Sequence, residues 1–137
     1  MIPLESVIEV GLDAYMVLVA LLFGSFINLC ADRLPRGESV IRPRSHCRSC
    51  GRVLNAVDLF PVAGYLVRVG RCASCGVPIG VSSPVIEALC GSAMLAAVAL
   101  LGPGRGAIAG FVAIAMVGAG VLGVGRLRRS TRGSQPG

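Results

Sequence analysis

Two Cys-x-x-Cys pairs are the part of the sequence with the clearest capacity for chemistry. Cys47 and Cys50 form the first pair, Cys72 and Cys75 form the second, and a glycine follows each pair. Two such thiolate hooks can close a tetrahedral four-sulfur site, because a small residue permits the turn that aims backbone N–H groups at sulfur. This donor set favours Zn²⁺; an iron site of the rubredoxin kind is the rival metal, and two unrelated redox or structural pairs are the rival interpretation. With all four positions filled by protein, the predicted metal is structural and not catalytic.

The remaining histidine and cysteines are expected to stand outside this set. His46, the only histidine, directly precedes the first hook and would be a superfluous fifth ligand, so we expect an imidazole beside the metal site or on the surface. Cys30 and Cys90 lie in or beside apolar stretches, where we expect them to pack as small apolar side chains.

The cysteine pairs lie in a polar segment between apolar stretches, which predicts a loop domain carried by membrane helices. The chain has 137 residues, 54% of them hydrophobic, and its mean hydropathy of +0.77 is too apolar for an ordinary soluble domain. We predict an all-α membrane protein with three transmembrane helices and a cytoplasmic four-cysteine zinc loop between the first and second. The predicted order is an external N-terminus (1–10), a first span (11–30), the zinc loop (31–80), a second span (81–101), a third span (107–124) and a basic tail (125–137).

The first span has a competing interpretation as a secretory signal peptide. Its length matches a hydrocarbon core of about 30 Å. Its start is acidic, with Glu5, Glu9 and Asp13, whereas a signal peptide begins with a basic region. A transmembrane helix is therefore the favoured interpretation.

Small residues and proline punctuate the second and third spans. Residues 82–84 (Ser-Ser-Pro) suit an N-cap and first helical turn, and residues 102–104 (Gly-Pro-Gly) predict a tight turn. Small residues four apart, at Gly106 and Gly110 and at Ala119 and Gly123, predict close helix packing. Gly118, Gly120 and Gly123 match a dinucleotide-binding fingerprint, but no strand precedes them, so we do not predict a nucleotide cofactor there.

The charge distribution orients the predicted helices. All thirteen basic residues are arginines, and eight of them fall between Arg33 and Arg71, beside the predicted spans. This is the positive-inside pattern, which accounts for the net charge of +6 without a nucleic-acid partner. It places the N-terminus outside and the zinc loop and C-terminus in the cytoplasm, where cysteines stay reduced.

An intramembrane carboxylate and an apolar stretch of the loop add candidate features. Glu87 lies about one turn inside the second span, where it is either a functional group or a carboxyl near the interface paired with a loop arginine. Residues 56–69 are mostly apolar but broken by Asp58, Pro61 and Gly64. That stretch is too short to span, so we expect an interfacial segment or a lid over the metal site.

A series of short motifs runs in order through residues 18–101. They are Gly24-Ser25-Phe26-Ile27-Asn28-Leu29, Arg33-Leu34-Pro35-Arg36-Gly37-Glu38-Ser39, Pro43-Arg44-Ser45-His46-Cys47, Asp58-Leu59-Phe60-Pro61, Gly70-Arg71-Cys72, Cys75-Gly76-Val77-Pro78-Ile79 and Pro84-Val85-Ile86-Glu87. In this order they resemble the start of bacterial prepilin peptidases. The resemblance implies a polytopic enzyme of the bacterial inner membrane that removes the leader of type IV pilin-like precursors and methylates the new N-terminus with S-adenosylmethionine. It also associates this N-terminal domain with methylation.

The sequence departs from that family in the residues that cleavage requires. Family peptidases cleave with two membrane-embedded aspartates, one of them in a Gly-x-Gly-Asp motif. Here Asp13, Asp32 and Asp58 stand in other contexts, and the nearest string, residues 123–126, has arginine in place of the acid. Aspartyl chemistry needs two carboxyls at one site. We therefore expect no peptidase activity from this chain alone, and a separately encoded aspartyl peptidase domain as its partner.

Three hypotheses follow for the function. The first is a stand-alone N-terminal domain that serves N-methylation or docking of type IV pilin-like precursors; the second is a non-enzymatic zinc-loop membrane adaptor; the third is a truncated remnant of a full-length prepilin peptidase. Methyl transfer mainly requires positioning of an amine and a sulfonium donor. The candidate catalytic residues are Glu38 and Asp58 in the loop and Glu87 in the second span.

Overall fold

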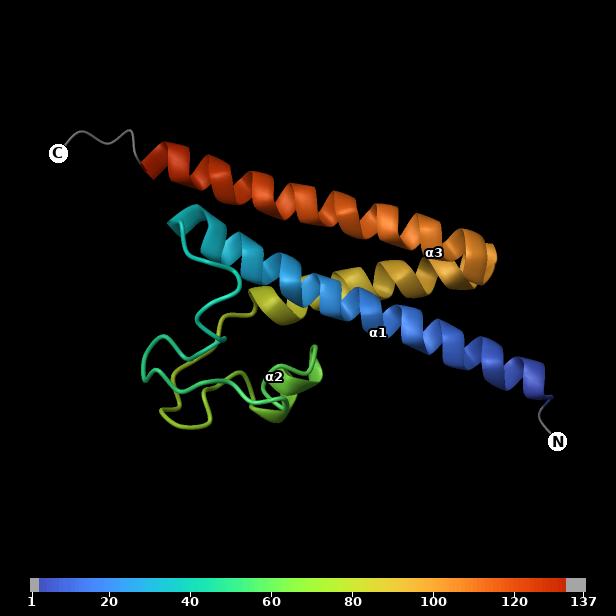
Figure 1. The fold of residues 1–137 in the computed structure, drawn as a ribbon, viewed down its shortest axis with the longest axis horizontal. Helices are drawn as coiled ribbons and strands as arrows, with labels where there is room; N and C mark the ends of the chain where they lie inside the picture. Colours follow the sequence, from blue (N-terminus) through green and yellow to red (C-terminus); the bar gives the residue numbers. More distant parts are fainter. Residues whose placement is uncertain (1–2, 133–137) are drawn as a thin grey trace.

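Helices and one long loop make up residues 3–132, the part of the chain that the structure describes (Figure 1). In this computed structural model the elements are α1 (Leu4–Arg33), a 3-10 turn η1 (Leu34–Arg36), α2 (Ala63–Val67) and α3 (Ser82–Arg132). Within these residues there are two isolated β-bridges but no strand. The predicted all-α class is confirmed, while the end of the predicted tail, 133–137, lies outside the described residues.

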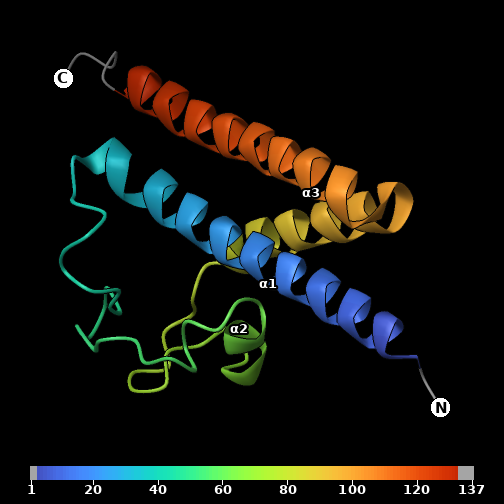
Figure 2. The same cartoon turned by 45° about the vertical axis from the view of Figure 1, so that its right-hand side comes forward.

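α3 is a hairpin of two helical arms. The break falls at Gly102, with φ 75° and ψ 168°, and Pro103 opens the second arm. Glycine reaches this backbone conformation without strain, and the fixed φ of proline suits a first helical turn. The two arms, 82–101 and 103–132, run side by side in opposite directions in both views (Figures 1 and 2). The chain thus reverses where the Gly-Pro-Gly sequence predicted a turn.

The start of α3 differs in detail from the prediction. The helix includes both Ser82 and Ser83, and the Ser83 hydroxyl does not cap the helix but donates to a Glu87 carboxylate oxygen at 2.8 Å. This pairing was not predictable from cap statistics, because a buried carboxylate one turn later competes for the hydroxyl.

α1 packs against both arms along a narrow line of small and medium side chains. Five residues with at most 4% of their surface exposed form this core: Ala20, Cys90, Met94, Val98 and Ile114. Phe23 of α1 also meets Phe111 of the second arm edge to face, with ring centroids 6.0 Å apart. The burial of Cys90 confirms its predicted packing role.

Most apolar side chains of the helices point away from this core. Leu22, Leu89 and Ile108, for example, are 50%, 52% and 70% exposed. Two helical stretches, Leu4–Arg36 and Ser82–Gly125, are long and apolar enough to cross a membrane. An apolar exterior of this extent is unusual for a water-soluble protein and suits a lipid environment.

Glycines set the closest helix contacts. A Cβ on Gly24 would lie 2.8 Å from the Glu87 Cα, and one on Gly106 would lie 2.5 Å from the Val98 Cα. Gly110 is similarly close to Met94. The predicted packing role is confirmed for Gly106 and Gly110 but is wrong for Gly123, where nothing lies within 4 Å, because that residue is on the open side of the second arm.

The loop between α1 and α3 lies at one end of the bundle. The C-terminal end of α3 lies at this same end, whereas the N-terminus of the chain and the Gly102 turn lie toward the opposite end (Figure 1). The arginine-rich loop and the arginine-rich end of α3 therefore lie at the same end of the bundle, as the charge distribution requires if one side of a membrane holds both.

We expect Gly24→Ala to weaken the contact between α1 and the first arm. Its Cβ would press on helix backbone, which cannot move aside as a flexible side chain would, and such overpacking costs about 1–3 kcal/mol. Gly11→Ala is the matched control, since Gly11 lies in the same helix with nothing within 4 Å. Unfolding in detergent, followed by circular dichroism, should show a lower midpoint for Gly24→Ala alone. Equal midpoints for the two variants would contradict the packing described here.

Candidate metal centre

The four predicted cysteines come together in the loop between α1 and α3. Their sulfur atoms all lie within 4.8 Å of one another. Cys47 Sγ is 3.8 Å from Cys75 Sγ, and Cys50 Sγ is 3.9 Å from Cys72 Sγ. A tetrahedral ion with metal–sulfur bonds near 2.3 Å holds its sulfurs about 3.8 Å apart. The spacing therefore fits one four-coordinate ion, and none of the four cysteines forms a disulfide.

Each cysteine pair is held by the same backbone pattern. In the first hook the Cys47 N–H donates to the Arg52 carbonyl at 2.8 Å, and the Gly51 N–H donates to the Cys47 carbonyl at 2.9 Å. In the second hook the corresponding donors are Cys72 and Gly76, and both distances are 3.0 Å. Each hook is also closed by an isolated β-bridge. Two copies of one local turn thus present two thiols each.

The glycine after each pair is required by the backbone of the turn. Gly51 has φ 71° and Gly76 has φ 67°, both in the left-handed region that glycine adopts without strain. Nothing lies within 4 Å of where a side chain would begin at either position. The predicted need for a small residue is therefore confirmed, and its cause is the backbone angle and not lack of space.

Backbone N–H groups tune the thiols, as the hook geometry predicts. The N–H groups of Cys50 and Ser49 lower the pKa of Cys47, and those of Cys75 and Ser74 lower the pKa of Cys72 to about 6. These donors stabilise the thiolate form, which is the form that binds metal.

Cys50 has the opposite tendency. The Arg52 N–H acts to lower its pKa, but burial and the neighbouring thiols together raise it to about 11. The centre thus combines a thiolate that backbone donors stabilise with a thiol that must lose its proton when an ion binds.

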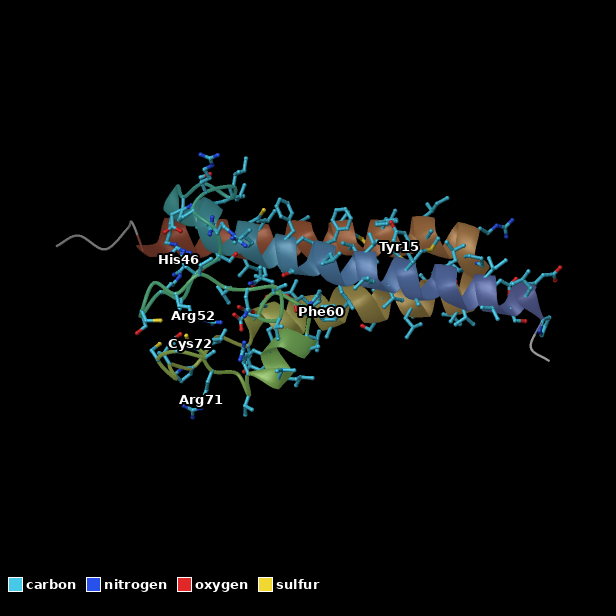
Figure 3. The ribbon with its side chains drawn as sticks, turned by 60° about the horizontal axis from the view of Figure 1, so that its bottom comes forward. Tyr15, His46, Arg52, Phe60, Arg71 and Cys72 are labelled. Carbon is cyan, nitrogen blue, oxygen red and sulfur yellow. The ribbon has the colours of Figure 1, made fainter. Side chains whose placement is uncertain are left out.

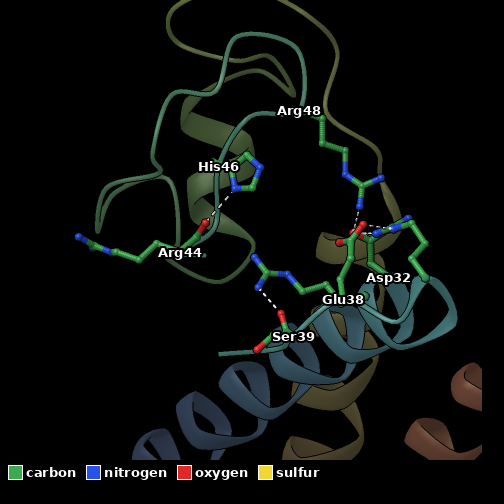
Figure 4. A network of polar contacts seen from close by, with 8 residues as sticks. Asp32, Glu38, Ser39, Arg44, His46 and Arg48 are labelled. Atoms are coloured by element: carbon green, nitrogen blue, oxygen red, sulfur yellow. Dashed lines mark hydrogen bonds and ion pairs between the residues drawn. The ribbon is translucent and has the colours of Figure 1, made fainter. Parts of the chain in front are cut away.

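His46 stands apart from the four sulfurs. Its Nδ1 donates to the Arg44 carbonyl at 2.9 Å, and the ring is exposed (Figure 4). The metal-binding cluster consists of the four cysteines without it. His46 is therefore a surface imidazole beside the site, as predicted.

The three candidate carboxylates occupy three separate environments. Glu38 is half exposed and accepts from Arg36 Nε at 2.9 Å. The Asp58 side chain is 4% exposed and accepts from Arg52 at 2.7 Å and from Arg68 at 2.6 Å.

The buried Asp58 carboxylate is held in its charged form. Burial alone would raise its pKa, but the Asn55 N–H and the guanidinium groups of Arg68 and Arg52 outweigh burial and lower the pKa of Asp58 below its ordinary value. Asp58 thereby forms ion pairs with two arginines from different parts of the loop.

Glu87 joins the loop to the helices. It is 5% exposed and accepts from the Val62 N–H at 2.7 Å and from the Ser83 hydroxyl at 2.8 Å. The predicted alternatives were a functional group or pairing with a loop arginine. The structure instead gives this carboxylate two uncharged donors, one of them the loop backbone.

Asp32 is a polar residue that the motif analysis did not single out. It forms ion pairs with Arg36 at 2.6 Å and with Arg48 of the first hook, so it ties the end of α1 to the metal loop (Figure 4). Asp32 also lines three clefts of about 520, 420 and 530 Å³. The spacing of four from Arg36 was visible in the sequence, whereas the pairing with Arg48 depends on the fold.

Comparisons with known proteins agree on one family. The family described as Bacterial Peptidase A24 N-terminal domain matches residues 18–101. This stretch covers more than half of the chain and includes all four clustered cysteines and Glu87. The chain therefore belongs to the Bacterial Peptidase A24 N-terminal domain family.

Relatives named "Prepilin leader peptidase/N-methyltransferase" match the same region. The one from Myxococcus xanthus is 40% identical over 77 residues, which is 56% of this chain and 23% of the relative. Those from Burkholderia pseudomallei and Klebsiella pneumoniae are 34% and 30% identical, over 72% and 76% of this chain and 40% and 48% of the relatives. The chain thus spans less than half the length of each of these relatives. No solved structure matches it.

We expect purified protein in detergent to bind one metal ion per chain, with zinc preferred over iron, because four thiolates close the coordination sphere. Serine at Cys47, Cys50, Cys72 or Cys75 should each abolish tight binding, whereas Cys30→Ser should retain it. Elemental analysis after gel filtration measures the stoichiometry. Loss of metal in Cys30→Ser but not in Cys72→Ser would overturn the assignment.

Metal affinity should fall as the pH falls, and more steeply below about pH 6. Cys50, with a pKa of about 11, must release a proton on binding throughout the neutral range, whereas protons compete for Cys72 only below its pKa of about 6. Each thiol that must be deprotonated contributes about a tenfold loss of affinity per pH unit. Competition with a chromophoric chelator of known pH dependence measures the slope. A pH-independent affinity would exclude thiolate ligation.

Proposed function

We propose that this chain is a membrane-bound module for the maturation of type IV pilin-like precursors, serving their N-methylation or docking, and that leader cleavage requires a partner. The observation that carries the proposal is the family match over residues 18–101, in which the assembled four-cysteine centre lies. The matched relatives are named for both leader peptidase and N-methyltransferase activity. One from Escherichia coli, 32% identical, is named for processing type 4 prepilin-like proteins.

The metal in this proposal is a structural Zn²⁺ ion held by Cys47, Cys50, Cys72 and Cys75. Sulfur spacing, the absence of a disulfide and the lowered pKa of two thiols support it. A closed four-thiolate ion supplies a cross-link and no activated water. Its contribution is to fix the two hooks against each other, and through Arg48 and Arg52 to orient the polar residues beside them.

The helices in this proposal cross the bacterial inner membrane three times, with spans over 11–30, 81–101 and 107–124. The reversal at Gly102 and the apolar exterior of α1 and of both arms of α3 support this arrangement. The metal loop faces the cytoplasm, because the loop and the C-terminal end of α3 carry most of the arginines at one end of the bundle.

The engagement of the carboxylates supports the need for a separate aspartyl peptidase domain. Asp32 and Asp58 are each bound by two arginines, so neither is paired with a second carboxyl with which it could share a proton. Glu87 holds a backbone N–H and a hydroxyl. A partner chain bringing two membrane-embedded aspartates would supply the acid and base that leader hydrolysis needs.

Two clefts beside the metal loop have a size suited to a methyl donor. One of about 530 Å³ is lined by Glu38, Arg33, Arg42 and His46, among others, and one of about 420 Å³ includes Asp58 and Ser83. Small-molecule sites commonly measure roughly 300–1,000 Å³. S-adenosylmethionine carries a positively charged sulfonium and a negatively charged carboxylate. In the Glu38 cleft, the Glu38 carboxylate could face the sulfonium and the arginines could face the carboxylate.

The proposal predicts that this chain alone does not cleave a prepilin leader but alters pre-cleaved pilin. Expression with a prepilin in cells lacking any other prepilin peptidase should leave the leader intact. The reason is that Asp32 and Asp58 are each bound by two arginines and cannot activate water. Supplying pre-cleaved pilin should yield a methylated N-terminus, read by mass spectrometry. Glu38→Gln should lower methylation, with Glu5→Gln as the control far from the loop.

Each outcome of this experiment separates the hypotheses. Leader removal by the chain alone would refute the dependence on a partner. Unmethylated pilin that nevertheless co-purifies with the chain would favour docking over methylation. Neither methylation nor binding would favour a remnant of a longer peptidase.

A further inference from the structure

The loop carries a cluster of apolar side chains that its own fold does not cover. Phe60, Leu66 and Val67 are 56%, 67% and 65% exposed, and Val69 is 80% exposed. All four flank or belong to α2. Phe60 and Val67 also line a shallow groove of about 290 Å³ made only of apolar residues: Ala56, Val57, Phe60, Ala63, Gly64 and Val67. We call residues 57–69 the apolar segment. An exposed patch of this kind in a protein that functions in water would be a liability.

The height of the apolar segment along the bundle is fixed by one hydrogen bond. The Val62 N–H, directly before α2, donates to the Glu87 carboxylate at 2.7 Å. Glu87 lies five residues beyond Ser82, where α3 begins, which is about 7–8 Å along the helix axis. The chain therefore descends from the metal hooks to a level more than a full turn inside the helices.

At that level the helices already present apolar side chains to their surroundings. Val85 and Leu89, two residues either side of Glu87, are 51% and 52% exposed. Gly24 of α1 lies against Glu87, and its neighbours Phe23 and Phe26 are 47% and 53% exposed. The apolar segment is thus beside the apolar belt of the bundle and continues it.

Polar groups of the apolar segment point inward. The Asp58 side chain is 4% exposed and bound by two arginines, and the Val62 N–H is taken by Glu87. Satisfied polar groups on one side and bare apolar side chains on the other are what a lipid interface requires.

The arrangement does not resemble a lid over the metal. Phe60 lies beside the first arm of α3, on the other side of the loop from Cys72 and Arg71 (Figure 3). The cleft that contains Cys47 and Cys72 is not lined by Phe60 or by α2. Of the two expectations for residues 56–69, the geometry therefore favours the interface.

We propose that the apolar segment inserts into the lipid interface beside the first arm of α3, so that the bilayer itself is its partner. The side chains of Phe60, Leu66 and Val67 enter the boundary between headgroups and acyl chains, about 5–10 Å deep. The inference rests on the membrane placement of the helices proposed above. Glu87 acts in it as the group that holds the segment at this depth.

Tryptophan fluorescence tests the proposal directly, because the protein contains no tryptophan. Phe60→Trp and Leu66→Trp each report on the apolar segment, so that failure of one to fold leaves the other. Leu89→Trp reports on the lipid-facing side of the first arm at the same level. Ile41→Trp, at a loop position 81% exposed, is the aqueous control. Each variant is reconstituted, with zinc, into vesicles of phosphatidylethanolamine and phosphatidylglycerol with or without bromine on the acyl chains.

Phe60→Trp and Leu66→Trp should be quenched by the brominated lipid as Leu89→Trp is, and protected from iodide, whereas Ile41→Trp should show the reverse. If iodide quenches both segment variants while bromine still quenches Leu89→Trp, the inference is overturned. The membrane placement of the helices would still stand in that case. Protection from both quenchers, relieved when zinc is removed, would also overturn it in favour of a lid. If Leu89→Trp itself escapes bromine, the membrane placement fails as well.

Discussion

The hydrogen bond between the Val62 N–H and the Glu87 carboxylate is the constraint on which the rest of the structure depends. It joins the loop to the helices at a point where α1 also lies close to α3, because Gly24 has no side chain to separate them. A buried carboxylate without donors would be costly, and so would an unpaired backbone N–H at that depth. Together with the Ser83 hydroxyl, the two groups satisfy each other. The loop is therefore not a free appendage of the bundle but is attached inside it.

The loop is organised around three further fixed points, one a cluster of thiols and two of them ion pairs. The four thiols gather the two hooks, Asp58 gathers Arg52 and Arg68, and Asp32 holds Arg48 to the end of α1. Arg33, 6% exposed, adds a fourth by donating to the Ser39 carbonyl at 2.7 Å. With almost no secondary structure of its own, the loop takes its shape from these cross-links, which is the usual solution for a segment too small to bury a core.

Local and periodic features of this fold were predictable from the sequence, and long-range pairings were not. The cysteine hooks, the helical class and the reversal near Gly102 follow from spacing, composition and turn chemistry, which act within a few residues. The partner of Glu87 could not be predicted, because a backbone N–H from residue 62 carries no signal in the sequence. The arginine partners of Asp58 and Asp32 were equally hidden, since eight arginines lie from Arg33 to Arg71 and spacing does not choose among them. Small-residue spacing identified Gly106 and Gly110 but also Gly123, because periodicity does not reveal which face of a helix has a neighbour.

The repetition of one turn in both hooks bears on how this loop can change during evolution. The sulfur ligands of each hook lie within its own few residues, and the length of the chain between the hooks affects the metal site mainly through the entropy of closing a loop. That entropy grows slowly, by about 0.6 kcal/mol for each doubling of length. Insertions and deletions between residues 54 and 69 therefore cost the metal site little, provided that Asp58 keeps Arg52 and Val62 keeps Glu87. The metal centre can stay constant across descendants while the stretch between the hooks adapts to membranes of different thickness or lipid composition.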